Sequence, residues 1–287
     1  MLIERGVDVT ARNNEGLISL HLASQGGHLD VACMLNESGA DVAVQNKEGS
    51  TPLHLSSQEG HVEVILMLIE RGADMKGQNK EGSTPLHLAS QKGQIGATHV
   101  LIKSGVDIMA QNKEGSTPLH LSSQNGQVGV THMLIESGAD VTARNNEGSI
   151  PLHLASQEGH VRITHMLIEH GADVTAQNED QKTPLHLASQ KGQVEVVRML
   201  IEYGVNMSSR NLDGFSPLHL ASQEGHIEVA RMLIEGGADV MAQNNEGSTP
   251  LHLALQEGQV DVARMLVERG AKETTQNRGS TSSHPAS

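Results

Sequence analysis

Apolar and polar positions follow a pattern that returns every 33 residues along the chain. Each unit contains a short apolar stretch around Leu-His-Leu and a longer stretch such as Val-Glu-Val-Ile-Leu-Met-Leu-Ile-Glu. In the unit 46–78, the longer stretch leaves Glu63, Leu66 and Glu70 three and four residues apart, which is the spacing of one solvent-exposed helical face. The pattern therefore predicts two short amphipathic helices in every unit.

Turn-forming residues mark the ends of both predicted helices in this unit. Thr51 offers a hydroxyl as an N-cap and is followed by a proline suited to the first helical position, so we expect a helix over about 52–58. A second helix is expected from 61 or 62 to about 70 or 71, with Gly72 as a left-handed stop. Gly49 lies among polar residues and closes a tight turn, which predicts a projecting finger before the first helix.

The segment Thr-Pro-Leu-His-Leu-Ala, or a variant with one or two changes, occurs eight times without insertion or deletion. Its histidines are His21, His54, His87, His120, His153, His186, His219 and His252. A 33-residue period with this hexapeptide resembles the ankyrin repeat, over about residues 1–278. The resemblance implies an all-α ankyrin-repeat solenoid of stacked helix-turn-helix units with β-turn fingers. It also implies that the motif histidine ties the start of the first helix to neighbouring backbone, and that fingers and first helices form a concave, protein-binding groove.

The period divides the chain into eight units with incomplete ends. Residues 1–12 match the second half of a unit, and residues 277–287 have the composition of a degenerate polar tail. The predicted repeats are 13–45, 46–78, 79–111, 112–144, 145–177, 178–210, 211–243 and 244–276.

Three units depart from the pattern at positions that control a cap or a turn. Ile18 and Ile150 replace the capping threonine and so remove its hydroxyl. Gln181 occupies the position of the finger glycine, where a positive φ would be strained unless the turn changes type.

Composition and charge narrow the range of partners and compartments. The net charge of -14 argues against a nucleic-acid phosphate backbone as the main partner. The lone Cys33 cannot form an internal disulfide, which suits a reducing compartment. No apolar run approaches the ~20 residues that span a bilayer. We expect a monomeric cytoplasmic protein without membrane insertion, and a nuclear location is equally compatible.

Seventeen histidines raise the question of a metal or catalytic site. Neighbouring stacked helices lie about 8–10 Å apart, whereas zinc needs each imidazole nitrogen within about 2.0–2.1 Å of one ion. His99, His132 and His165 form a second row on the predicted solvent face. His61 is replaced by Gln94 one unit later, which suits a hydrogen-bonding cap better than proton transfer. Without a catalytic motif, we expect no enzyme, no cofactor, no metal and no small-molecule substrate.

Selectivity for a partner is expected where the nearly identical units differ. Most fingers carry Asn or Lys, Glu and Ser, and solubility alone explains such a strip. The sixth and seventh units differ, and both aromatic residues of the chain lie there at positions that the ankyrin family uses for recognition. Interface energy concentrates in a few large side chains. The predicted contact residues are Lys182, Tyr203, Leu212, Asp213 and Phe215, and the alternative is drift at exposed positions.

The sequence thus predicts a scaffold that binds a partner protein in the concave groove, without catalysis. The alternative is a sensory or regulatory array at the C-terminal end of a larger multidomain protein, since the chain opens inside a predicted helix whose partner helix is missing. A third class, an enzyme using the histidine rows with a metal, requires bound zinc.

Overall fold

The computed structural model describes residues 8–271, which form sixteen helices and no strand, so the predicted all-α solenoid is confirmed. The half-unit expected at 1–12 lies largely outside the described residues, and the tail expected at 277–287 lies entirely outside them. The helices are α1 (Ser19–Gln25), α2 (Leu29–Glu37), α3 (Pro52–Glu59), α4 (Val62–Glu70), α5 (Pro85–Lys92), α6 (Ile95–Lys103), α7 (Pro118–Gln124), α8 (Val128–Glu136), α9 (Pro151–Glu158), α10 (Val161–Glu169), α11 (Pro184–Gln190), α12 (Val194–Glu202), α13 (Pro217–Gln223), α14 (Ile227–Glu235), α15 (Pro250–Gln256) and α16 (Val260–Glu268).

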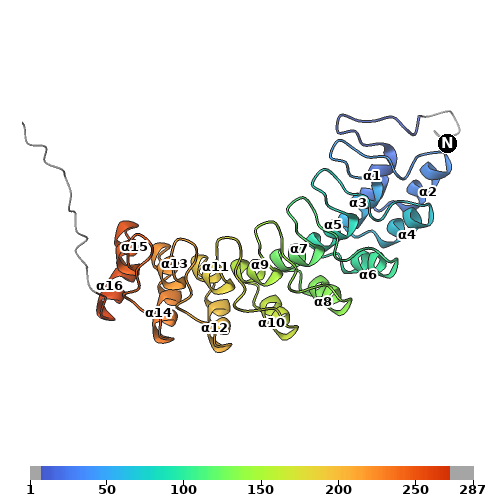
Figure 1. The fold of residues 1–287 in the computed structure, drawn as a ribbon. Helices are drawn as coiled ribbons and strands as arrows, with labels where there is room; N and C mark the ends of the chain where they lie inside the picture. Colours follow the sequence, from blue (N-terminus) through green and yellow to red (C-terminus); the bar gives the residue numbers. More distant parts are fainter. Residues whose placement is uncertain (1–7, 272–287) are drawn as a thin grey trace, which may run out of the picture.

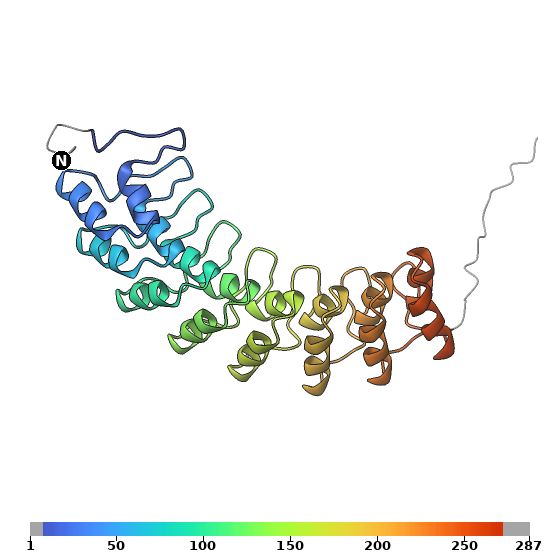
Figure 2. The same ribbon diagram turned by 180° about the vertical axis from the view of Figure 1, so that it is seen from behind.

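The helix pairs stack side by side into a curved row (Figures 1 and 2). The odd-numbered helices and the projecting fingers lie on the inner side of the curve, and the even-numbered helices lie on the outer side. Successive odd-numbered helices approach one another more closely than successive even-numbered helices do. Because one row is packed more tightly than the other, the stack bends toward the tight row and forms a concave surface.

The helix ends follow from the turn residues that the sequence places there. In the second unit, α3 and α4 occupy nearly the predicted ranges. After α4, Gly72 adopts a left-handed φ of 85°. Its N–H donates to the carbonyl of Ile69 at 3.0 Å, and the N–H of Ala73 donates to the carbonyl of Leu68 at 2.9 Å. This pair of hydrogen bonds is a Schellman motif, and it is closed by burial of both Leu68 and Ala73.

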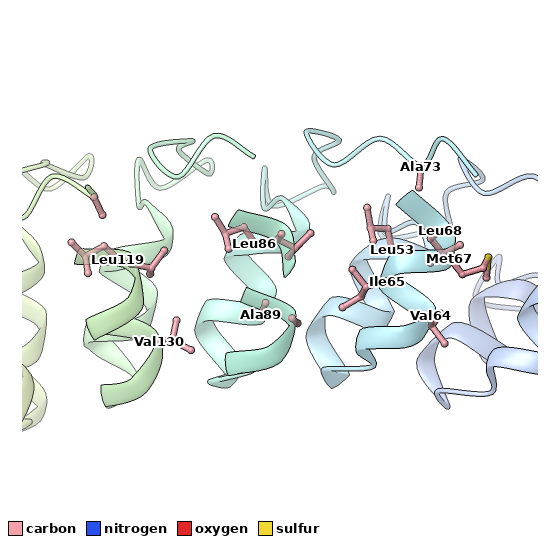
Figure 3. Packing of buried hydrophobic residues seen from close by; sticks show 14 of the residues in the cluster. Leu53, Val64, Ile65, Met67, Leu68, Ala73, Leu86, Ala89, Leu119 and Val130 are labelled. Atoms are coloured by element: carbon pink, nitrogen blue, oxygen red, sulfur yellow. The ribbon is translucent and has the colours of Figure 1, made fainter. Parts of the chain in front are cut away.

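The core is a row of equivalent side chains rather than one centre. Leu53, Leu86 and Leu119 occupy the same position of α3, α5 and α7, and all three are fully buried (Figure 3). The buried side chains form two clusters, of which the first ends at Ala176 and the second begins at Leu185. Each unit is therefore stabilised mainly by its immediate neighbours.

The turn at Gln181 keeps its type despite the missing glycine. Gln181 has a φ of 58° and is the only non-glycine residue with a positive φ in the described range 8–271. Its N–H donates to the carbonyl of Asn178 at 2.9 Å, as the N–H of Gly148 does to Asn145 one unit earlier. The sixth finger therefore accepts the left-handed conformation, with the strain that a side chain brings to it.

Replacing Leu152 by Ala should destabilise the array locally. Leu152 on α9 is fully buried, so the lost contacts and the cavity should reduce the free energy of unfolding by about 2–5 kcal/mol. Hydrogen exchange should show faster exchange in the neighbouring units and little change in distant ones. The exposed Leu66→Ala variant is the control, with an expected change within about 0.5 kcal/mol. Equal acceleration of exchange in every unit would contradict this weakly coupled stack.

Replacing Gln181 by Gly should stabilise the protein by about 1 kcal/mol, because the left-handed conformation becomes unstrained. The reverse change, Gly247→Gln, tests strain alone, since no described atom lies within 4 Å of a Cβ built on Gly247, whose φ is +80°. It should destabilise by a similar amount. Urea unfolding measures both, and a loss of stability in Gln181→Gly would show that the glutamine side chain contributes more than its strain.

Candidate functional site

The motif histidines join each first helix to the finger of the next unit. In the second unit, the N–H of Thr51 donates to Nδ1 of His54 at 3.2 Å, and Nε2 of His54 contacts the carbonyl of Ser83 at 3.1 Å. Because Nδ1 accepts, the neutral ring carries its proton on Nε2 and donates it to that carbonyl. The same pair of contacts occurs at every motif histidine from His21 to His219. The role implied by the resemblance is thus confirmed for these seven residues.

The hydroxyl before the proline is used differently from the prediction at Thr51, Thr84, Thr117 and Thr249. Thr51 Oγ1 makes no hydrogen bond to a helix amide and instead lies 2.8 Å from Nδ1 of His54. Ile18 and Ile150 have no hydroxyl, yet their amides still donate to the histidine at 3.2 Å. The imidazole therefore provides the part of this cap that recurs in every unit. The predicted hydroxyl cap forms at Thr183 and Ser216, whose hydroxyls accept from the amides of His186 and His219 at 3.4 Å.

A second row of hydrogen bonds joins each unit to the preceding one. His61 Nε2 contacts the carbonyl of Gln25 at 2.9 Å, and Gln94 Nε2 donates to the carbonyl of Gln58 at 3.1 Å. The exchange of His for Gln thus reflects hydrogen bonding, as predicted. The acceptor, however, belongs to the first helix of the preceding unit, because these side chains make no cap hydrogen bond to their own helices.

The fingers form a third row of hydrogen bonds, between main-chain atoms at every junction, and the side chains of Asn146 and Asn245 add further bonds to the preceding finger. The N–H of Lys47 donates to the carbonyl of Glu15 at 2.9 Å, and the equivalent bond recurs at each of the seven junctions between units. It persists between Leu212 and Asp180, where the side chains differ from those of the other fingers. The fingers therefore make an unbroken wall along the concave side, whatever side chains they display.

Two adjacent hollows, lined by residues at equivalent positions of successive units, lie between this wall and the first helices. Their volumes are about 440 and 370 Å³. Residues that line the first include Glu114, Ser116, Gln124, Asn145, Glu147 and Leu154, and the residue one period after each of them lines the second. Glu147 belongs to both hollows. The polar strip of the fingers thus borders at least two adjoining hollows.

Four of the five predicted contact residues lie in the sixth and seventh fingers. Lys182 Nζ lies 3.6 Å from Asp180 Oδ2, and the N–H of Leu212 donates to the carbonyl of the same Asp180 at 2.9 Å. The side chain of Leu212 is 58% exposed. Asp213 is exposed, and its carbonyl accepts the N–H of Asn245 at 3.0 Å. The structure therefore brings Lys182, Leu212 and Asp213 together on the finger wall.

The two aromatic residues have different surroundings. Phe215 is half-buried in the finger, its ring centroid lies 5.8 Å from that of His219, and its carbonyl accepts a hydrogen bond from His186. Tyr203 follows α12 and is 43% exposed, with its ring centroid 6.4 Å from that of His165 on α10. Tyr203 lines a hollow formed by α10 and α12. Its neighbours thus lie on the second helices, and the five predicted residues belong to two surfaces.

Burial holds five of the motif histidines neutral. Loss of solvent lowers the pKa of His54, His120, His153, His186 and His219 to about 4, although the backbone carbonyls that they contact oppose this shift. These imidazoles are fully enclosed and fully used in hydrogen bonds. Within residues 8–271, no group of three or more His, Cys, Asp or Glu side chains is placed to hold a metal ion.

Paired helices, projecting fingers and three rows of hydrogen bonds between units define an α-helical repeat solenoid with a concave groove. The family model for ankyrin repeats (three copies) matches residues 1–79, 20–112, 72–145, 97–178, 143–211 and 204–277. The chain belongs to the ankyrin repeat family. A comparison with the curated proteins gave no match. None of the helices in the described part of the chain has the length and apolar character needed to cross a membrane.

Stability should fall in mild acid because of the buried histidines. Their folded-state pKa of about 4 lies below the ordinary value of 6.5, so the unfolded chain binds protons first. Their full contribution is present above pH 6.5 and is lost as the pH falls toward 4. At pH 5 the expected loss is on the order of 1–2 kcal/mol per histidine. Urea unfolding at pH 7 and pH 5 measures it, and His153→Gln should reduce the proton uptake on unfolding by about one. Equal urea midpoints at the two pH values would contradict this.

Proposed function

We propose that this protein is a scaffold that holds a partner protein in its concave groove, without catalysis or a cofactor. Ankyrin repeats are generally protein–protein interaction modules. The observation that carries the proposal is the finger wall and the adjoining hollows, which present shaped subsites on the inner side of the curve. A rigid wall keeps these subsites in place before a partner arrives, which reduces the ordering entropy that binding must overcome.

The absence of catalysis is supported by how the histidines are used. Nitrogens of His54 and His61 contact backbone groups in neighbouring units, as do their equivalents along the row. Burial lowers the pKa of five motif histidines to about 4, below the range needed for proton transfer at neutral pH. Members of the family are typically non-catalytic. We further propose that the protein acts as a monomer inside the cell, in the cytoplasm or the nucleus, which its single cysteine supports.

Within the groove, the sixth and seventh fingers are the proposed centre of recognition. Leu212 is the most exposed large hydrophobic residue of the fingers, and Lys182 and Asp213 surround it with charge. A large apolar side chain ringed by polar groups is the usual arrangement of an interface hot spot. Phe215 supports this finger from its half-buried position, and Tyr203 offers a separate contact on the second helices.

Alanine at Leu212 should weaken the binding of a groove partner by about 2 kcal/mol, or roughly 30-fold in Kd, if it is a hot spot. Its backbone hydrogen bonds do not depend on the side chain, so the free energy of unfolding should be almost unchanged. The partner is first identified by affinity capture with the intact array and is then titrated by calorimetry.

Two variants accompany this titration. Leu66→Ala removes a comparable exposed leucine from the outer face of α4 and should leave Kd unchanged. Tyr203→Ala reports separately on the hollow between α10 and α12. Unchanged affinity in Leu212→Ala, Lys182→Ala and Asp213→Ala would refute the finger site.

A further inference from the structure

The two neighbouring hollows combine an apolar floor with negative walls. In the first, Leu154 forms part of the floor, and Glu114 and Glu147 stand on the fingers. Both glutamates are exposed, and in the described residues their carboxylates have no ion pair or hydrogen bond. Gln124 lines the same hollow with a side-chain amide that is likewise free within this part of the chain. An occupant thus meets apolar surface, carboxylates and an amide.

Each hollow is lined by more carboxylates than lysines. The first contains two glutamates and one lysine, Lys113. The second contains Glu147, Glu179 and Asp180 against Lys182 and Lys191. Because Glu147 lines both hollows, the two together contain four carboxylates and three lysines, which leaves one carboxylate in excess. A lysine or arginine side chain matches this chemistry, because its methylene stem covers the leucine while its charged head reaches the carboxylates.

The repetition of the hollow restricts the conformation of the occupant. Neighbouring helices lie about 8–10 Å apart, so equivalent subsites recur at about that distance. A polyproline II segment rises about 3.1 Å per residue with three residues per turn, so every third side chain faces the groove at about 9 Å intervals. A β-strand turns every second side chain to one face, at about 6.6 or 13 Å, and does not match.

An α-helix with a cation at every seventh residue also matches this spacing, at about 10.5 Å. Its main-chain groups, however, are already hydrogen-bonded, and its diameter is about 10–12 Å. A polyproline II backbone leaves its N–H and C=O groups unpaired. Gln124 in the first hollow and Gln190 in the second have side-chain amides without a hydrogen bond in the described residues, so they can pair with such groups. Gln157, one period after Gln124, donates its amide to Glu158 Oε1 at 3.1 Å. The free amides therefore favour the extended segment.

We propose that the groove binds an extended basic polypeptide of polyproline II conformation in which Lys or Arg recurs at every third residue, one cation for each hollow. This rests on the proposed function and specifies the chemistry of the partner segment. Glu147, which is shared by two hollows, is the central contact. Because the subsites are alike, affinity should increase with the number of triplets through multivalent binding.

The test uses the intact protein and two fluorescent peptides of equal composition. The first contains six Arg-Pro-Ser triplets, and the second has the same residues with the arginines spaced alternately by two and four. We expect the regular peptide to bind about tenfold more tightly, with Kd rising in high salt. Equal affinities would show general charge attraction and overturn the proposal. So would tighter binding of a helical peptide with arginine at every seventh residue.

Two double variants each remove two glutamate charges, one pair in the hollows and the other pair on the outer face of α4. Glu114→Gln with Glu147→Gln should weaken binding of the regular peptide by about tenfold. Glu63→Gln with Glu70→Gln, on the exposed face of α4, should leave the affinity unchanged. Equal losses in both double variants would overturn the proposed site. If a captured partner depends on Leu212 but the regular peptide does not bind, the scaffold function stands and only the basic-segment proposal fails.

Discussion

The architecture depends on a buried, neutral imidazole that serves two units at once. His54 accepts the amide that begins its own helix and donates to the carbonyl of Ser83 in the next finger. A lysine in this place has no acceptor atom for the amide of Thr51, and a carboxylate has no donor for the carbonyl of Ser83. A single side chain therefore sets the start of a helix and the position of a finger. The groove is shaped by the repetition of this contact, although the histidines themselves lie beneath its surface.

Much of this fold was predictable because local chemistry determines it. Proline and glycine set the helix limits, and the helical spacing that left Leu66 on the solvent side agrees with its exposure. The strained φ of Gln181 was also predictable, since a turn of fixed type imposes the same dihedral angle on any residue. The finger wall was not predictable from side chains, because the hydrogen bonds that recur at every junction join main-chain atoms and carry no sequence signal.

The candidate site was predicted less completely than the fold. Variation between units led to Leu212 and Tyr203, but a linear period does not tell which surface a side chain reaches near the end of a helix. The structure places Tyr203 against His165 and Leu212 on a finger. Glu147 and Gln124 line the hollows, but a search for differences between units does not select them, because their positions carry the same kind of side chain in unit after unit. In a stack of repeats, residues at the same position of successive units lie next to one another in space. A side chain that recurs in every unit therefore predicts a continuous row on the surface.

The identical junctions also affect how such a protein can change in length. Every junction is closed by the same three kinds of hydrogen bond, whichever two units meet. Removal or duplication of one 33-residue segment would join units that offer the same donors and acceptors at the junction. Recombination between the nearly identical segments can thus lengthen or shorten the groove in whole steps. The length of the concave surface can therefore vary by whole units without any change of fold.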